Sequence, residues 1–210
     1  MNPAPTDLRR TWVWVAVYCA VLLWSAILPK DRLTWWLEVM PALLGLSVLA
    51  LTYRRFPLTR LVYQLILVHC VILMVGGHYT YAEVPLFDWL RQGLTLERNH
   101  YDKLGHFAQG FVPAMLAREI LLRKAVVRGR GWLFYIVVSI CLAISAFYEL
   151  IEWWVALLSE TAAEAFLGTQ GYVWDTQSDM AFALVGAILA LVLLGRVHDR
   201  ELAGLVSRRG

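Results

Sequence analysis

Acidic and histidine side chains occur in three pairs whose spacing would place each pair on one face of a helix. These pairs are Asp102 with His106, Glu149 with Glu152, and Asp175 with Asp179. Residues three or four positions apart are neighbours on a helix surface. Carboxylates and histidines together bind divalent metals, and a bound metal can activate water for hydrolysis. The spacing therefore indicates a candidate cluster for metal binding or hydrolytic chemistry.

Roles within this cluster follow from the residue types. Glu149, Glu152 and His106 are the candidate catalytic residues, because carboxylates and imidazoles can accept a proton from water. Substrate contacts would come from Tyr79, Tyr81 and Asn99, which lie in the neighbouring polar segments 76–81 and 99–106. A divalent metal, if one is bound, would take its ligands from six histidine and acidic residues: His78, Asp102, His106, Glu149, Asp175 and Asp179.

Two other interpretations of the same residues stay open. In one, Arg98 and Lys103 pair with the acidic residues and only lock three helices together. In the other, the carboxylates relay protons or ions in a small transporter. That interpretation needs a polar path through the protein, and the far halves of the last three apolar segments contain few ionisable groups. No HExxH motif and no pair of Glu-x-x-His motifs is present to decide the question.

The composition indicates that lipid surrounds the elements that carry these residues. The chain has 210 residues, of which 60% are hydrophobic and 17% charged, and its mean hydropathy is +0.58. Soluble domains are about 45–50% apolar. No basic run with interleaved aromatic residues suggests binding to nucleic acid. We therefore expect a single integral membrane domain over residues 1–210, with the lipid bilayer as its partner.

Continuous apolar runs predict six transmembrane helices in an all-α, polytopic bundle. A helix needs about 20 mostly apolar residues to cross a bilayer, and lipid requires backbone hydrogen bonds to be satisfied within the segment. The six expected spans cover about residues 11–28, 34–53, 58–76, 104–122, 132–157 and 179–195.

The distribution of basic residues predicts the orientation of these spans. Cytoplasmic loops of membrane proteins carry an excess of lysine and arginine. Most of the 19 such residues fall on one side when the N-terminus is taken as cytoplasmic. We therefore expect both termini in the cytoplasm of a bacterium, the spans in its inner (plasma) membrane, and the three acidic pairs at the outer, periplasmic face.

The apolar surroundings of the acids suggest that they face the inside of the bundle. Glu149 follows a long run without charge, and a carboxylate within a membrane helix costs about 2.5–3.5 kcal/mol at the helix centre. Asp179 leads into a stripe of small residues, which lets helices approach closely. The stripe consists of Ala183, Gly186, Ala187 and Ala190.

The polar segments also resemble a known family. GGHYTYAEVP, RNHYDKLGHFAQGF, FYELIEWW and TQGYVWDTQSDM are similar to segments of bacterial inner-membrane proteins of the YjdF type, over about residues 11–196. The function of that family is uncharacterised, so the resemblance implies a multi-pass membrane protein of the inner membrane.

A broader resemblance is to VanZ-like membrane proteins, through Asp102-Lys103-Leu104-Gly105-His106-Phe107, then Glu149, then Asp175 and Asp179. That resemblance implies action near the cell envelope. Glu152 and the segment 78–81 depart from the VanZ pattern. The leading hypothesis is a protein that acts on a lipid or lipid-linked headgroup of the envelope.

Overall fold

The computed structural model describes residues 5–158 and 169–207, and their regular structure is entirely helical. Seven helices are present in the described ranges: α1 (Pro5–Ala26), α2 (Arg32–Thr52), α3 (Arg60–Tyr79), α4 (Pro85–Gly93), α5 (Tyr101–Arg123), α6 (Arg130–Leu158) and α8 (Asp175–Ser207). Each expected span overlaps one of the six long helices, so the all-α prediction is confirmed.

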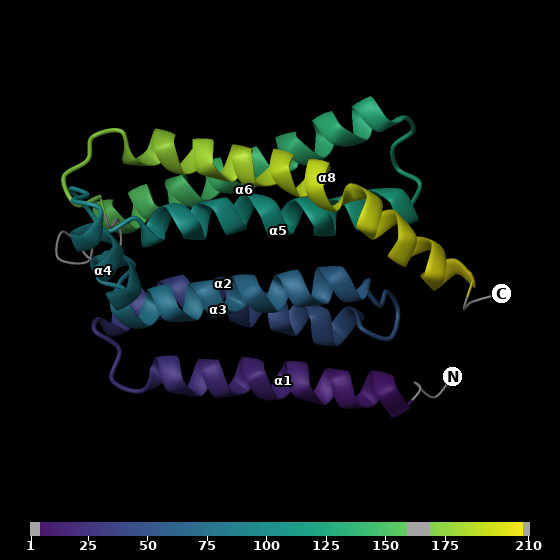
Figure 1. The fold of residues 1–210 in the computed structure, drawn as a ribbon, viewed down its shortest axis with the longest axis horizontal. Helices are drawn as coiled ribbons and strands as arrows, with labels where there is room; N and C mark the ends of the chain where they lie inside the picture. The colour runs from purple at the N-terminus through teal and green to yellow at the C-terminus, as the bar shows by residue number, and fades with distance from the viewer. Residues whose placement is uncertain (1–4, 159–168, 208–210) are drawn as a thin grey trace.

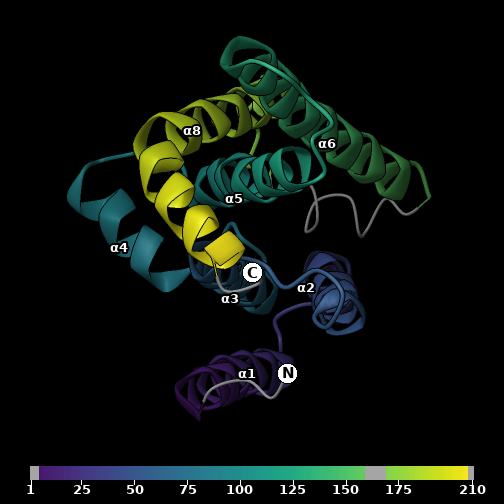
Figure 2. The same ribbon diagram turned by 90° about the vertical axis from the view of Figure 1, so that its right-hand side faces the viewer.

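Four of the long helices, namely α2, α3, α6 and α8, are long and apolar enough to cross a membrane. The helices α1 and α5 do not meet that criterion, and six spans therefore stay a prediction. The position of α5 explains its polarity, because α5 packs against α3, α6 and α8 (Figure 2). A helix surrounded by protein can carry polar groups that a lipid-facing helix cannot.

The long helices run side by side, and the two ends of the bundle differ (Figure 1). The chain termini lie at one end, which we call the terminal end. The short helix α4 lies at the opposite end, which we call the α4 end. At about 1.5 Å per residue, the 23 residues of α5 span about 34 Å, which is close to the thickness of a bilayer's hydrocarbon core.

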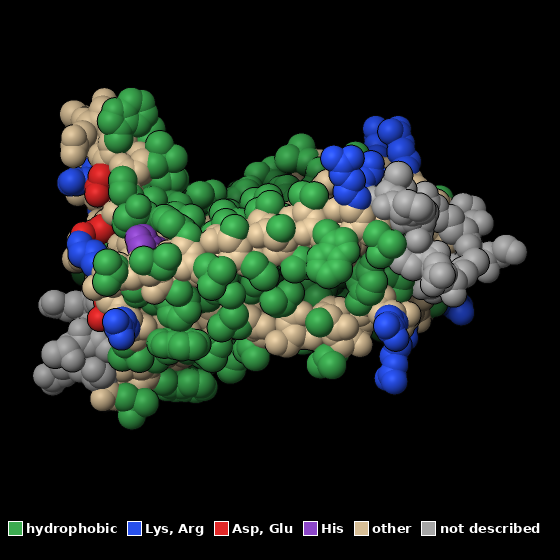
Figure 3. Space-filling view, turned by 90° about the horizontal axis from the view of Figure 1, so that it is seen from below, with side chains coloured by type: hydrophobic (Ala, Val, Ile, Leu, Met, Phe, Trp, Pro, Cys, Tyr) green, Lys and Arg blue, Asp and Glu red, His purple; other side chains and the backbone are tan. Residues whose placement is uncertain are grey.

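Hydrophobic side chains cover the middle of the face seen in Figure 3. Lysine and arginine side chains gather toward the terminal end of that face, and acidic side chains appear at the α4 end. Such an apolar band between two polar ends is the expected surface of a protein that sits in a bilayer.

The helices α5 and α8 pack most closely where glycines remove the side chain. A Cβ atom at Gly110 would collide with the backbone of Ala183, and one at Gly186 would collide with the backbone of Phe107. Ala183, like Ala187 and Ala190, is fully buried. The predicted close approach along this stripe is therefore confirmed, and it sets the distance between the two helices that carry Asp102 and Asp179.

The end of α3 determines where the segment 76–81 goes. Thr80 and Tyr81 adopt left-handed backbone conformations, with φ of 62° and 50°, and this turn ends the helix. The ring of Tyr81 then packs directly on Gly76 and Gly105, where any Cβ atom would collide with it. This contact holds the end of α3 against the start of α5.

Candidate functional site

Lys103 lies at the centre of a buried cluster at the α4 end. Its Nζ donates hydrogen bonds to Asp175 Oδ1 (2.7 Å), to Asp102 Oδ2 (3.2 Å) and to a carboxylate oxygen of Asp179. Arg98 Nη2 also donates to Asp175 Oδ1, at 2.5 Å. All five side chains are buried. Two cations from α5 and the segment before it therefore tie the start of α8 to α5.

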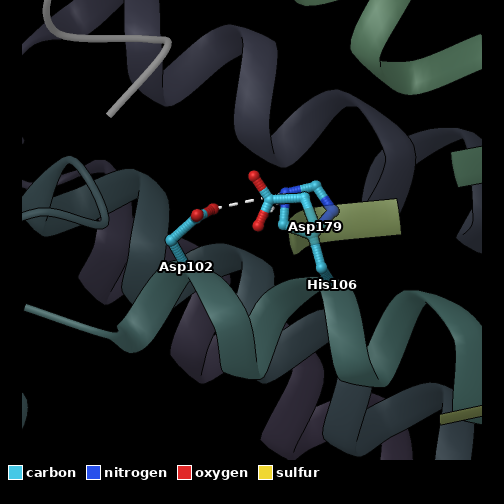
Figure 4. Close-up of side chains that lie close together, drawn as sticks. All are labelled: Asp102, His106 and Asp179. Atoms are coloured by element: carbon cyan, nitrogen blue, oxygen red, sulfur yellow. Dashed lines mark ion pairs between the residues drawn. The ribbon is translucent and has the colours of Figure 1, made fainter. Parts of the chain in front are cut away.

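His106 lies one turn deeper on α5 and faces three carboxylates. Its Nε2 is 3.3 Å from Asp102 Oδ1 and 3.9 Å from Asp179 Oδ1, and its Nδ1 is 3.8 Å from Glu149 Oε1. Ligand atoms of Asp102, His106 and Asp179 all lie within 4.8 Å of one another (Figure 4). A group this compact could hold one metal ion, with ligand atoms from α5 and α8. The predicted convergence of these helices is confirmed.

The two glutamates of α6 lie on the buried face of that helix, as their spacing predicts. Glu149 and Glu152 are each 8% exposed. Oε1 of Glu149 has no hydrogen-bond partner among the described residues, although His106 lies beside it. Glu152 interacts electrostatically with Glu149, with His106 and with Glu38. A third helix thus contributes carboxylates to the cluster.

Glu38 of α2 is a member of the cluster that the sequence did not reveal. It is buried, and Tyr148 Oη donates a hydrogen bond to its Oε2 at 3.0 Å. The signal for it is one acidic residue within the apolar run RLTWWLEVMPALL. Its connection to the cluster runs through Tyr148, which lies 110 positions away in the chain, so only the tertiary fold identifies it.

The buried charges of this cluster do not balance. Its carboxylates are Asp102, Asp175, Asp179, Glu149, Glu152 and Glu38, and its basic groups are Arg98, Lys103 and His106. Buried charges need a partner, since an isolated ion in a low-dielectric interior is strongly destabilised. The excess of carboxylates therefore requires bound protons or a bound cation.

The remaining candidate residues lie at the edge of this cluster or away from it. His78 Nδ1 is 3.0 Å from the Ser25 carbonyl oxygen, and its ring packs against Trp24 and Tyr79. In the described chain it makes no hydrogen bond or ion pair with the cluster. The structure thus places His78 on the face of α3 that packs against α1, away from the proposed metal ligands.

Asn99 and Tyr81, two of the candidate substrate contacts, are buried. Asn99 Nδ2 donates hydrogen bonds to the Val84 carbonyl oxygen and to Asp88 Oδ1, and its Oδ1 accepts one from the Tyr101 backbone N–H. These bonds shape the segment between α4 and α5. Contact of these two residues and of Tyr79 with a substrate stays a prediction.

His100 borders the cluster on its outer side. It is partly exposed and makes no hydrogen bond or ion pair with another residue in the described ranges. Partial burial and the nearby charges of Arg98 and Lys103 lower the pKa of His100. Its ring is therefore neutral near pH 7 and offers one N–H donor.

A second buried polar cluster lies at the terminal end, where the sequence suggested few ionisable groups. Glu119 accepts hydrogen bonds from the backbone N–H and Oγ1 of Thr59 and from Arg123 Nη1, and its Oε2 is 3.0 Å from His198 Nε2. Arg118 pairs with Asp199 at 2.6 Å. The expectation of a nearly uncharged far half is wrong for α5, because partners from α3 and α8 satisfy its charges.

Comparisons with known proteins agree with the membrane character of the fold. The chain is 53% identical over 189 residues to the inner membrane protein YjdF of Escherichia coli (strain K12), covering 89% of this chain and 90% of that protein. No solved structure matches the chain. Neither comparison bears on the VanZ-like resemblance. A family model described as predicted membrane protein (DUF2238) matches residues 10–200, and the chain belongs to this family.

Proposed function

We propose that the chain is a bacterial inner-membrane protein whose buried cluster at the α4 end binds a divalent cation and acts on a lipid or lipid-linked headgroup. In this proposal six helices cross the membrane, both termini are cytoplasmic, and the α4 end faces the periplasm. The inner-membrane location is supported by the relative from Escherichia coli, and the orientation by the excess of basic residues on the terminal side.

The observation that carries the proposal is the unsatisfied acidity around His106. Asp102, His106 and Asp179 present ligand atoms within 4.8 Å of one another, and Oε1 of Glu149 faces His106 without a hydrogen-bond partner. A divalent cation would offset the excess of buried carboxylates. It would also supply the Lewis acid that polarises a phosphoryl or carbonyl oxygen.

The residues of α6 would then provide the acid–base chemistry. Neither Glu149 nor Glu152 makes a hydrogen bond to Arg98 or Lys103 in the described structure. A carboxylate without a fixed cationic partner can accept a proton from water. His106 would orient Glu149 or bind the metal, and these two roles are distinguished by the experiment below.

The structural alternative is a lock between helices, and Lys103 favours it. One ammonium group contacts three carboxylates from two helices, and a metal would compete with it for Asp102 and Asp179. A lock of this kind accounts for Asp175 and Asp179. It does not account for Glu149, Glu152 and Glu38, which have no cation of their own.

Metal analysis of the purified protein tests the proposal. The protein is purified in detergent without chelators, and its metals are measured by mass spectrometry for the native chain and for His106→Ala and Asp179→Asn. His198→Ala is the matched control, because His198 is also a buried histidine beside a carboxylate, at the other end of the bundle.

We expect a stoichiometric divalent metal in the native protein and in His198→Ala. The two cluster variants should bind it at least about tenfold more weakly, since losing one ligand of a small site removes much of its affinity. A native protein without metal, or cluster variants that retain as much metal as His198→Ala, would refute a metal site in this cluster and leave the lock.

A further inference from the structure

A groove opens beside the cluster, between α4, the start of α5 and the start of α8. Its volume is about 800 Å³, within the range of small-molecule sites. Its wall is formed by Phe87, Arg98, His100, Lys103, Phe107 and Phe182, among others. Lys103 belongs both to this wall and to the buried cluster, so the groove borders that cluster.

The polarity of the wall changes along the helix axis. Arg98, His100 and Lys103 lie at the α4 end, whereas Phe107 and Phe182 lie deeper, toward the middle of the bundle. Lys103 and Phe107 are four residues apart, or about 6 Å along α5. A cationic end above an apolar wall complements a molecule with an anionic head and a hydrocarbon tail, in the orientation that a lipid has in a leaflet.

The helix α4 places the mouth of the groove at the level of the lipid headgroups. Leu86 and Trp89 of α4 are more than half exposed, at 61% and 69%, while Asp88 and Arg91 pair with each other on the same helix. Short amphipathic helices of this kind lie in the membrane interface, and tryptophan is enriched there. Phe87, on the same helix, lines the groove.

Arg98 is the cation of the wall that is already oriented and still has donors to offer, because the three N–H groups of Lys103 are taken by carboxylates. Arg98 is fixed by hydrogen bonds from its terminal nitrogens to Asp175 and to the Thr169 carbonyl oxygen, and a guanidinium carries five N–H donors in total. His100 has no partner in the described structure. Glu97 is the one acidic residue of the lining, and it is exposed to solvent.

We propose that this groove binds a lipid whose phosphate-bearing headgroup has a net negative charge, with the phosphate at Arg98 and His100 and an acyl chain along Phe107 and Phe182. The substrate then enters from the bilayer rather than from water. Its role as a substrate rests on the proposed function, whereas its binding does not. Arg98 and His100 would hold the phosphate beside Lys103, which contacts Asp102 and Asp179, the proposed metal ligands.

Lipid binding to the purified protein tests this proposal. Native mass spectrometry in detergent measures the affinity for dioctanoylphosphatidylglycerol and for dioctanoylphosphatidylcholine, with sodium phosphate as a competitor. The variants are His100→Ala, at the headgroup end, and Phe182→Ala, on the apolar wall. Tyr135→Ala is the matched control. Tyr135 is an exposed aromatic residue of a separate pocket near the start of α6, away from the cluster.

We expect the anionic lipid to bind at least about tenfold more tightly than the zwitterionic one, because both carry the phosphate but only the zwitterionic one adds a quaternary ammonium, which Arg98 repels. His100→Ala and Phe182→Ala should each weaken its binding about tenfold, and Tyr135→Ala should not. Because His100 and Phe182 are partly exposed, neither variant leaves a buried cavity that would unfold the protein.

Three results would overturn the groove as a lipid site. These are equal binding of the two lipids, equal effects of Phe182→Ala and Tyr135→Ala, and displacement of the lipid by sodium phosphate at equal concentration. The outcome is independent of the metal test. Selective lipid binding by a protein without metal would uphold the groove and refute the proposed metal chemistry. A metal-containing protein without lipid selectivity would uphold the metal site and refute the groove.

Discussion

Replacing Lys103 with methionine tests how the buried carboxylates are held. Methionine keeps the length and apolar stem of lysine but removes the ammonium group that contacts Asp102, Asp175 and Asp179. The three carboxylates would be affected unequally. Asp175 keeps Arg98 at 2.5 Å, and Asp102 keeps His106 at 3.3 Å, whereas Asp179 keeps only His106 at 3.9 Å.

The magnitude follows from this inequality. Removing one partner of a buried ion pair costs about 3–5 kcal/mol, because a charge is left without compensation. Asp179 is 2% exposed and cannot turn to water, so we expect Lys103→Met to lower the free energy of unfolding by about 3–5 kcal/mol. For a chain of this size that is a decrease in Tm on the order of 10 °C.

The assay is thermal unfolding in detergent, followed by tryptophan fluorescence. The double variant Lys103→Met/Asp179→Asn removes the uncompensated charge together with its partner, and it should recover most of the lost stability. Lys124→Met is the control, because Lys124 is an exposed lysine at the other end of the same helix. A Lys103→Met variant that loses no more than this control, or a double variant no better than the single one, would refute the argument.

Two further substitutions test the packing and the membership of the cluster. Gly110→Ala should destabilise the protein by about 1–3 kcal/mol, because the new Cβ meets the rigid backbone of Ala183. The control Gly45→Ala, with no atom within 4 Å of its Cβ, should be neutral or stabilising by up to about 1 kcal/mol. Equal Tm values for the two variants would contradict the close packing of α5 on α8. Tyr148→Phe should lower the free energy of unfolding by about 1–3 kcal/mol, because buried Glu38 loses its hydrogen-bond donor. Thermal unfolding measures this loss beside the exposed control Tyr135→Phe, and equal Tm values for the two variants would show that Glu38 does not depend on Tyr148.

Local spacing in the sequence was enough to predict the pairs that the helices bring together. Asp102 and His106 are four residues apart on α5, and any helix would place them on one face. The stripe after Asp179 consists of small residues, which in a membrane protein indicates close helix packing. The registration of α5 against α8 follows from that stripe, so the convergence of Asp102 with Asp179 could be predicted as well.

Contacts that depend on tertiary structure could not be predicted in this way. Glu38 reaches the cluster through Tyr148, and Glu119 meets His198 from 79 positions away; neither separation has a local signature. His78 was expected among the metal ligands because it adjoins a polar segment. Its direction is instead determined by its position on the face of α3 that packs against α1, and the neighbour of that face could not be read from the residues.

The two buried clusters of this molecule can be compared with each other, and the comparison bears on their roles. Glu119, at the terminal end, has hydrogen bonds to both carboxylate oxygens and two arginines nearby. A cluster that only locks helices together needs this kind of saturation, since an unsatisfied buried group costs about 1–3 kcal/mol.

The cluster at the α4 end lacks that saturation. Oε1 of Glu149 has no partner in the described structure, and Glu152 adds a further carboxylate beside it without a cation. If Glu149 and Glu152 only held helices together, glutamine or an apolar side chain at either position would give a more stable protein. We therefore expect stability to rise, or to stay unchanged, in Glu149→Gln, and a binding or catalytic function to be lost. A marked fall in Tm for Glu149→Gln would instead favour the lock.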